Sequence, residues 1–200
     1  VYSRLMELDE QLRAVPGVAE RLERVDRLTW VATLRDGVRF HDGRLLTSAD
    51  VVFTITSILD PATASPLRGA YRSLATVEAV DARTVRFTLA KPYAPFLNRL
   101  VDFPIVPPKY TTEKGNQGMT LRPVGTGPFK FVSLVKDDHL TLEAFDRHWR
   151  GAPKIAKITF TSIPEPFTRS AALRNNEVDL ITTVPPNLGR ELERVPGVKV

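Results

Sequence analysis

Gly125-Thr126-Gly127-Pro128 is the segment whose composition comes nearest to a phosphate-binding loop. Such a loop needs a third glycine or a following Lys-Ser/Thr, and it opens a helix. Here the glycines lead into alternating apolar residues, which is the pattern of a strand. We therefore predict that the glycines permit a tight crossing between two chain segments and that no nucleotide binds there.

The histidines do not have the spacing of a metal site. His41, His139 and His148 fall on a predicted hairpin, strand and loop, and no two have the i, i+4 spacing of a helical zinc motif. We expect His41 to cap or pack the turn at Asp42-Gly43. The sequence contains no cysteine, which excludes thiol nucleophiles, disulfides and Cys-ligated metals. We expect no metal and no cofactor.

Paired carboxylates are the remaining catalytic possibility, because Glu165, Glu177 and Asp179 could act as an acid and a base. Glu165 fits a helix N-terminus and Glu177 fits a turn equally well, so we predict structural roles for both. The sequence also lacks the Gly-x-Ser-x-Gly elbow of serine hydrolases. We therefore predict that the protein is not an enzyme and has no catalytic residue.

The composition is that of an ordinary globular protein. Hydrophobic residues make up 42% and charged residues 26% of the chain, and no apolar run approaches the roughly 20 residues of a membrane span. The net charge of +5 invites a nucleic-acid interpretation. However, the arginines alternate with acidic residues, as in residues 21–27, and no aromatic residues interleave with them. We expect a solvated surface and no nucleic-acid partner.

The stretch LRDGVRFHDGRLLTSADVVF, residues 34–53, predicts two chain reversals followed by a helix. Each Asp-Gly pair favours a tight turn. The alternating residues before and between the pairs predict a hairpin of residues 28–34 with residues 38–40. Thr47 to Asp50 form a capping-box variant. Behind it one helical face is apolar, and Asp60-Pro61 ends the helix; the apolar residues are Val51, Val52, Ile55, Ile58 and Leu59.

The remaining elements follow from the same rules. VPGVAERLE at residues 15–23 is predicted to be helical, and the proline-rich turn at 104–108 with the polar loop at 111–118 is predicted to be a subdomain boundary. The other predicted elements are strands at 75–80 and 84–90, a short helix near 96–100, strands at 129–135, 140–145 and 155–163, a helix at 164–175, and a buried strand at 178–184.

The last three of these elements predict a right-handed βαβ unit. Ligands of open α/β sheets lie beyond the carboxyl ends of the strands. This rule places Thr182, Thr183, Val184 and Pro185 at a candidate ligand site.

Residues 34–53 closely resemble the signature of the family 5 extracellular solute-binding proteins, the peptide, oligopeptide and nickel receptors of ATP-driven bacterial (ABC) importers. Four further stretches resemble the family in the same order. They are VPGVAERLE at 15–23, VDARTVRFTLAKPYAPFL at 80–97, PVGTGPFKF at 123–131, and FDRHWRGAPKIAKITFTSIPEPFTRSAALRNNEVDLI at 145–181. Together the five stretches extend over nearly the whole chain.

The resemblance implies an α/β fold of the type II periplasmic-binding-protein class, with an α+β subdomain and part of a mixed-sheet lobe. Residues 1–12 would supply the first strand of ligand-binding lobe I, residues 13–118 the α+β subdomain, and residues 119–200 the return to lobe I with the βαβ unit. Family members are much longer. Val1 opens without a leader, and residues 197–200 have the pattern of a strand just beginning. We therefore expect an amino-terminal fragment without the second lobe.

The function implied by the resemblance is capture of a peptide between two closing lobes and its delivery to a membrane permease. The protein would be a monomer, in the periplasm or anchored as a lipoprotein at the cell surface. Two alternatives remain open: a solute-sensing domain of a transcription regulator, and a binding protein for nickel chelates or other small solutes. A single lobe has little to close on, so we expect residues 1–200 alone to bind solute weakly or not at all.

The resemblance also implies contacts in the cleft. Tyr2 and Ser3 would lie in the loop after the first strand, which lines the cleft, and Thr126 and Gly127 would lie near its floor. With Thr182, Thr183 and Pro185 they complete the predicted ligand-binding residues. Trp149 is expected to pack beneath a Trp-x-Gly turn.

Overall fold

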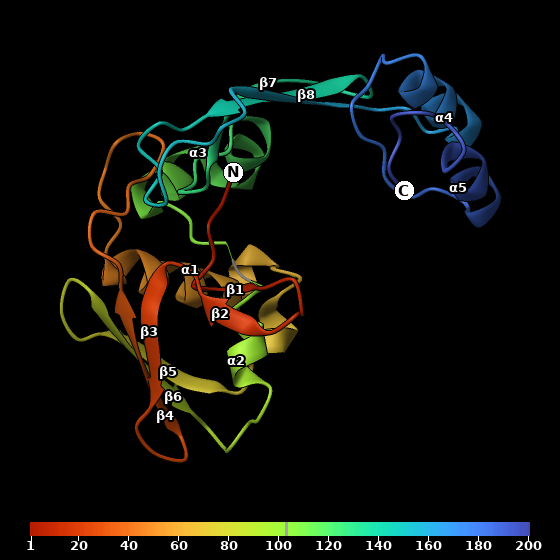
Figure 1. Ribbon diagram of the computed structural model, residues 1–200. Coiled ribbons are helices and arrows are strands. Elements are labelled where there is room, and N and C mark those ends of the chain that lie inside the picture. The colour runs from red at the N-terminus through yellow and green to blue at the C-terminus, as the bar shows by residue number, and fades with distance from the viewer. Residues whose placement is uncertain (103) are drawn as a thin grey trace. The chain divides into compact units, whose positions relative to one another are not determined.

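The computed structural model describes residues 1–102 and 104–200, and the side chain of Asn116 is outside that description (Figure 1). The chain divides into two compact units. Unit 1 comprises residues 1–133 and 141–158, and unit 2 comprises residues 134–140 and 159–200.

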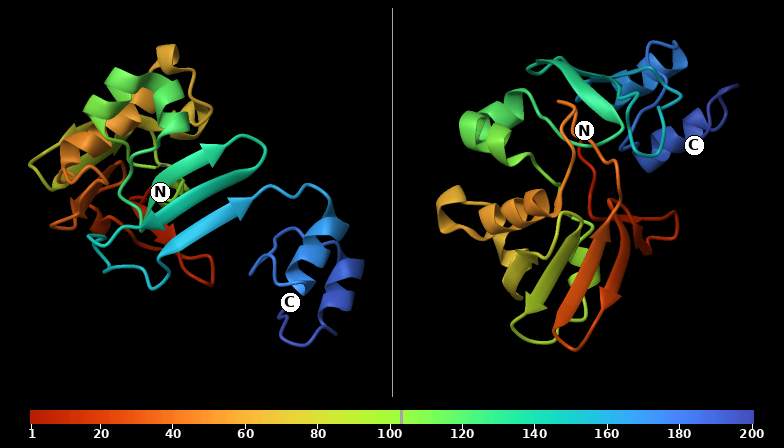
Figure 2. Two further views of the ribbon diagram at one scale, coloured as in Figure 1. Left: turned by 90° about the horizontal axis from the view of Figure 1, so that it is seen from above. Right: turned by 90° about the vertical axis from the view of Figure 1, so that its left-hand side faces the viewer.

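The centre of unit 1 is an antiparallel sheet with strand order β3-β4-β6-β5. Its strands are β3 (Ala19–Arg24), β4 (Thr29–Leu34), β5 (Leu74–Ala79) and β6 (Thr84–Leu89). The helix α1 (Ser48–Leu59) packs on this sheet. Around them lie β1 (Met6–Leu8), β2 (Ala14–Pro16), the 3-10 helices η1 (Pro61–Thr63) and η2 (Arg68–Tyr71), α2 (Phe96–Arg99) and α3 (Pro108–Leu121). Figure 2 shows the same elements from two further sides.

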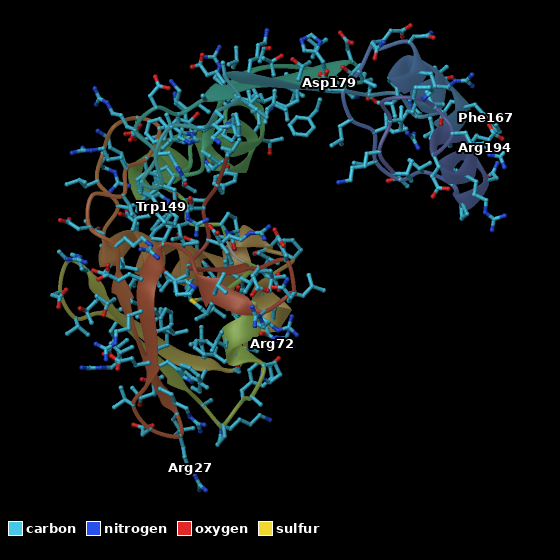
Figure 3. All side chains as sticks on the ribbon, in the orientation of Figure 1. Arg27, Arg72, Trp149, Phe167, Asp179 and Arg194 are labelled. Atoms are coloured by element: carbon cyan, nitrogen blue, oxygen red, sulfur yellow. The ribbon has the colours of Figure 1, made fainter. Side chains whose placement is uncertain are left out.

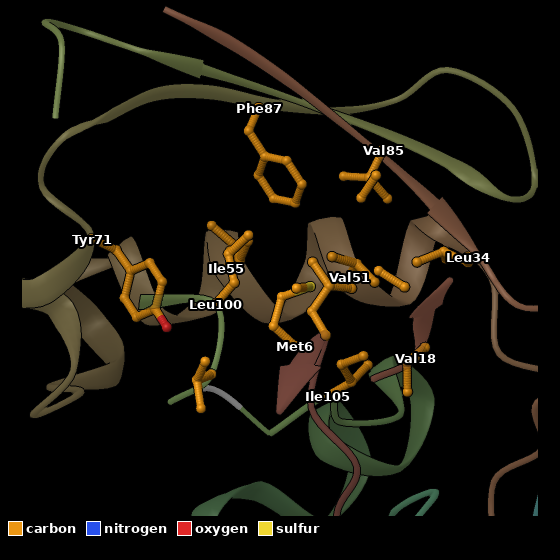
Figure 4. Packing of buried hydrophobic residues seen from close by; sticks show 14 of the residues in the cluster. Met6, Val18, Leu34, Val51, Ile55, Tyr71, Val85, Phe87, Leu100 and Ile105 are labelled. Carbon is orange, nitrogen blue, oxygen red and sulfur yellow. The ribbon is translucent and has the colours of Figure 1, made fainter. Parts of the chain in front are cut away.

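The core of unit 1 follows the predicted periodicities. Val85, Phe87 and Leu89 of β6 alternate with exposed or half-buried neighbours and are themselves buried. Val51 and Ile55 of α1 are fully buried in the same cluster (Figure 4). The predicted strands at 75–80 and 84–90 and the short helix near 96–100 are confirmed to within one or two residues. Trp30 is partly buried and packs against this core.

The start of α1 depends on one buried carboxylate. Asp50 is 2% exposed and accepts hydrogen bonds from the Thr47 backbone N–H at 2.7 Å and from the Thr47 hydroxyl at 3.1 Å. Arg44 binds the same carboxylate with two nitrogens, at 2.9 and 3.1 Å. The predicted capping box is present, and the predicted end of the helix at Asp60-Pro61 is confirmed.

The helix predicted at residues 15–23 is wrong. These residues form part of β2, a turn at Gly17, and β3, which pairs with β4. A Cβ on Gly17 would lie 2.5 Å from the Arg4 carbonyl oxygen, so the backbones pass too closely for any other residue. The helix-forming residues 20–23 were the misleading signal, because backbone pairing with β4 outweighs a propensity of a few tenths of a kcal/mol per residue.

The hairpin predicted between residues 28–34 and 38–40 is also wrong. Strand β4 pairs with β3 and β6 instead. The second Asp-Gly pair does make a tight reversal, in which the Phe40 N–H donates to the Arg44 carbonyl at 2.8 Å and Arg39 bridges to Leu45. Gly43 has a φ of +91°, which explains the glycine. A turn signal fixes a reversal but not which strands become partners.

The polar loop predicted at residues 111–118 is replaced by α3, which begins at Pro108 and continues to Leu121. Pro108 suits the first helical position because its missing N–H has no partner there in any helix. Gly115 interrupts the helix with a φ of 60° and a ψ of −172°. Two glycines and several threonines have low helix propensity, and for this reason the sequence pattern did not predict the helix.

The second sheet has the order β7-β8-β9, formed by β7 (Phe129–Val135), β8 (His139–Ala144) and β9 (Lys157–Thr161). The predicted turn at Asp137-Asp138 is confirmed, with Asp137 at a φ of 61°. Two helices of unit 2 follow, α4 (Pro166–Arg174) and α5 (Pro186–Leu192). The predicted helix at 164–175 therefore forms.

The buried strand predicted at residues 178–184 does not form, and Leu180 is 74% exposed. A parallel strand needs a hydrogen-bonded neighbour, and no described residue pairs with this segment. The βαβ unit is therefore absent from the described chain. Residues 197–200, expected to begin a strand, are also irregular. Figure 3 shows the side chains of this unit, including Phe167, which is exposed on α4.

Candidate functional site

Residues 1–3 and 125–127 cross at very short range in unit 1. A Cβ on Gly127 would lie 2.6 Å from the carbonyl carbon and oxygen of Val1, and one on Gly125 would lie 2.7 Å from Tyr2 Cδ1. Real Cβ atoms do not approach other atoms so closely, so both positions require glycine. The prediction that these glycines permit a tight crossing is confirmed.

Hydrogen bonds join the two segments of this crossing to each other, and Trp149 joins them to a further part of unit 1. The Gly127 N–H donates to the Val1 carbonyl at 2.7 Å, and the Ser3 hydroxyl donates to the Thr126 carbonyl at 2.9 Å. The Trp149 indole N–H donates to the Ser3 hydroxyl at 3.4 Å. The guanidinium carbons of Arg35 and Arg150 lie over the Trp149 ring, 4.9 and 4.3 Å from its centroid.

His41 makes three contacts with the same crossing. Its backbone N–H donates to the Gly125 carbonyl at 2.9 Å, its Nδ1 accepts the Gly125 N–H at 3.3 Å, and its Nε2 lies 3.0 Å from the Gly127 carbonyl. Because Nδ1 accepts, Nε2 carries the proton and donates. The ring also packs edge-on against Phe145, with centroids 5.1 Å apart. His41 therefore binds the crossing, whereas the sequence analysis predicted that it caps or packs the turn at Asp42-Gly43.

Burial lowers the pKa of His41 from 6.5 to about 4, more than the hydrogen bond to Gly127 raises it. A histidine whose pKa falls on folding binds its proton more readily when unfolded. Its contribution to stability is therefore complete above about pH 6.5 and is lost as the pH falls toward 4.

We expect acidification from pH 7 to pH 5 to lower the free energy of unfolding through His41 by about 1–2 kcal/mol, after allowance for the partly exposed ring. Urea unfolding of the protein and of His41→Phe at both pH values measures the contribution of His41. The other titrating groups are common to both chains, so the difference between the two losses of stability comes from His41. Equal losses of stability in the two chains would contradict the assignment to His41.

The predicted cleft residues at the crossing have different exposures. Ser3 is 4% exposed and Thr126 is fully buried. Tyr2 is half-buried; burial and, to a lesser extent, the nearby Tyr110 raise the pKa of its phenol to about 12. Tyr2 therefore has more exposed surface than Ser3 or Thr126, and contact of any of the three with a solute remains a prediction.

Tyr2 lines a groove with a volume of about 810 Å³ in unit 1. One wall is α1, with Phe53, Thr54, Ser57 and Ile58, and the adjoining wall is the segment 62–67. Pro104, Val106 and residues of α3 between Thr111 and Thr120 complete it. All of these lining residues are apolar or carry hydroxyl groups, and none is charged. The groove is therefore suited to uncharged side chains and to amides, which hydroxyl groups can hydrogen-bond.

Sequence reasoning missed all of this lining except Tyr2. A weak signal was present in PATASPL at residues 61–67, where small residues and two prolines follow a capped helix and mark an exposed loop. A second, smaller pocket of about 430 Å³ is lined by His41, Arg122, Lys130 and Glu143 among others. Lys130 is paired there with Glu143 at 3.0 Å.

Thr182, Thr183 and Pro185 lie in unit 2 and form a separate group. Thr183 has a φ of 57°, which is unusual for a threonine. Arg169 holds it there by donating to the Thr183 carbonyl at 3.1 Å and to the carbonyls of Ile163 and Pro164 at 2.8 and 2.7 Å. Thr182 and Thr183 are exposed, and their role in binding remains a prediction.

The described residues contain no group of His, Asp and Glu side chains that could hold a metal ion. Glu177 accepts a hydrogen bond from the Asn175 amide at 3.2 Å, as a turn residue would. A search of the described helices for one long and apolar enough to cross a bilayer finds none.

Comparison with known families decides which family the fold represents. The family model for bacterial extracellular solute-binding proteins, family 5, matches residues 13–200. The chain belongs to the family 5 solute-binding proteins. The family recognised from the sequence signatures is therefore confirmed.

A similar relative of this family 5 chain is the glutathione-binding protein GsiB of Pectobacterium atrosepticum, 29% identical over 96% of this chain and 38% of that protein. Among solved structures, the oligopeptide-binding protein AppA of Bacillus subtilis, in complex with a nonapeptide, is 28% identical. It has a TM-score of 0.90 over 100% of this chain and 41% of its own. This chain therefore spans about two fifths of the length of these relatives.

Two further solved structures that resemble this chain carry other solutes. AgaA of A. tumefaciens R10, in complex with agropinic acid, is 28% identical, with a TM-score of 0.92 over 98% of this chain and 40% of its own. NikZ of Campylobacter jejuni, in complex with Ni(L-His), is 30% identical, with a TM-score of 0.82 over 89% of this chain and 36% of its own. These matches confirm the predicted α/β fold of the type II periplasmic-binding-protein class, over only part of each structure.

Proposed function

We propose that this chain is the amino-terminal part of a solute receptor that captures peptides and delivers them to the permease of an ABC importer. The observation that carries the proposal is the uncharged groove beside Tyr2 in a family 5 fold. A groove of apolar and hydroxyl side chains suits a peptide, whose backbone amides need hydrogen-bond partners and whose side chains are frequently apolar.

The same groove disfavours a nickel chelate. A nickel chelate coordinated by the protein would need an imidazole or carboxylate at the groove, and none of the described lining residues is a His, Asp or Glu. An acidic solute such as an opine would call for a cation near the groove, and no lining residue is charged. Peptide is therefore the solute class that this part of the site supports best, and nickel chelates or other small solutes are the alternative.

Capture requires a second surface. A ligand shifts the equilibrium between an open and a closed form only if it binds the closed form more tightly. A groove on one lobe is present in both forms, so the additional contacts of the closed form must come from a second lobe. We therefore propose that residues 1–12 and 119–200 contribute to lobe I, that residues 13–118 form its α+β subdomain, and that a second lobe closes on the groove. Residues 1–200 alone would bind solute weakly.

The receptor would act without catalysis, as a monomer in the periplasm or as a lipoprotein at the cell surface. A solute-sensing domain of a transcription regulator would use the same fold. The two roles differ in what precedes Val1: a signal sequence or lipobox cysteine supports transport, whereas a helix-turn-helix domain would overturn it.

Calorimetry on the full-length protein tests the solute class. We expect heat of binding with a mixture of tripeptides to pentapeptides and none with Ni(L-His) or agropinic acid. Tight binding of either of the latter two, with no binding of peptides, would replace the proposed peptide function with that solute.

Tyr2→Ala in the full-length protein is expected to weaken peptide binding about tenfold, because it removes a half-buried aromatic surface worth on the order of 1–2 kcal/mol. Tyr2→Phe is the matched control. It keeps the ring and should lose less than threefold, since only the hydroxyl is removed. Affinities for one bound peptide, measured by calorimetry, provide the comparison. Equal affinity of Tyr2→Ala and the unmodified protein would remove Tyr2 from the site.

A further inference from the structure

The ring of Tyr2 packs against a backbone segment that His41 holds. A Cβ on Gly125 would lie 2.7 Å from Tyr2 Cδ1, so the Tyr2 ring rests directly on the Gly125 backbone. Gly125 itself is bonded twice to His41, through its carbonyl at 2.9 Å and its N–H at 3.3 Å. The position of Gly125 therefore determines where the Tyr2 ring can lie.

The two sides of the His41 ring have different partners. Nδ1 accepts from Gly125 and Nε2 donates to Gly127, which requires a neutral ring of one tautomer. Phe145 contacts the ring and fixes its plane. A protonated ring has two donors and no acceptor, so it cannot accept the Gly125 N–H.

We infer that His41 is a positioning residue for the solute groove: its neutral ring fixes Gly125, and Gly125 fixes the ring of Tyr2. Protonation of His41 removes the hydrogen bond from the Gly125 N–H to the ring, which loosens the Gly125 backbone beneath the ring of Tyr2. The inference rests on the proposed function only in that Tyr2 is taken to contact the solute.

Several charged groups face the imidazole and act on its protonation. Lys130 opposes its positive form, and Asp42 favours it. Arg122, Glu143 and Tyr110 line the same small pocket as His41. Lys130 is paired with Glu143. Burial nonetheless has the largest effect on the ring.

Amide exchange measured by NMR tests the inference without any solute, so its failure is distinct from failure of the proposed function. In the full chain at pH 7.5, His41→Phe is expected to raise the exchange rate of the Gly125 amide at least tenfold, because phenylalanine keeps the packing on Phe145 but cannot accept a hydrogen bond. His139→Phe is the matched control at a partly exposed histidine bonded to Asp138, and it should leave Gly125 unchanged.

Two further measurements separate positioning from a loss of stability. His41→Gln has an amide that can both accept and donate, so it should restore most of the Gly125 protection. In the unmodified protein, protection of Gly125 corrected for intrinsic exchange should fall as the pH decreases from 6.5 toward 4, and the ring signals of Tyr2 should shift over the same range. His41→Phe should show neither pH-dependent change.

Unchanged protection of Gly125 in His41→Phe would overturn the inference. So would a Tyr2 signal that does not move with pH in the unmodified protein, and this second measurement holds even if every variant fails to fold.

Discussion

Asp50→Ala is expected to lower the free energy of unfolding by about 3 kcal/mol. Asp50 is almost fully buried and accepts four hydrogen bonds, two from Thr47 and two from Arg44. Removing one member of a buried ion pair typically costs 3–5 kcal/mol because the other charge is left without its partner, and loss of the helix cap adds about 1 kcal/mol. Arg44 is partly exposed, so water can solvate its guanidinium once Asp50 is removed. The expected loss of stability therefore lies at the lower end of the roughly 3–5 kcal/mol range.

Urea unfolding followed by circular dichroism measures this loss. Asp36→Ala is the matched control, because Asp36 is exposed on a turn and accepts only the N–H of Gly37 among the bonds described; its effect should stay within about 0.5 kcal/mol. A loss below about 1 kcal/mol for Asp50→Ala would show that the carboxylate is not essential to the start of α1.

Gly127→Ala is expected to destabilise the protein by about 3 kcal/mol and to abolish measurable peptide binding by the full-length receptor. The new Cβ would lie 2.6 Å from the Val1 backbone. Overpacking typically costs 1–3 kcal/mol, and the upper value applies because backbone atoms cannot rotate away as a side chain can. The crossing would have to open, which would displace Tyr2 from the groove wall.

Gly69→Ala provides the control for this substitution. Gly69 lies in η2, and a Cβ there would meet no atom within 4 Å, so the change should be neutral or should stabilise by up to about 1 kcal/mol. Thermal unfolding of the two variants gives the stability difference, and calorimetry with peptide gives the affinity. Equal melting temperatures for Gly127→Ala and Gly69→Ala would mean that the crossing can accommodate a Cβ at position 127 without loss of stability.

Local signals in the sequence predicted local structure correctly. Thr47 and Asp50 marked the start of α1, and the alternation of Val85, Phe87 and Leu89 gave β6 its buried face. The glycines of 125–127 were assigned to a close crossing for the right reason. Each of these inferences uses residues within a few positions of one another, where propensity, capping and periodicity act directly.

The candidate site was less predictable. Tyr2 was assigned through the family signatures, and the groove walls on α1, the 62–67 segment and α3 were not anticipated. His41 was assigned to its own turn because its true partners, Gly125 and Gly127, lie 84 and 86 positions away. A hydrogen bond to a backbone atom leaves no trace in the partner's residue type, so such a contact has no sequence signature.

The sequence by itself determined the family, the helix α1, the strands β5 and β6 and the absence of cysteine chemistry, because these depend on composition and on short-range patterns. Only the tertiary structure decided that residues 15–24 form strands, that residues 108–121 form a helix, and that a neutral histidine secures the segment beneath Tyr2. The physical reason is that the free energy of strand pairing and of a buried hydrogen bond depends on the partner, and the topology of the chain selects that partner.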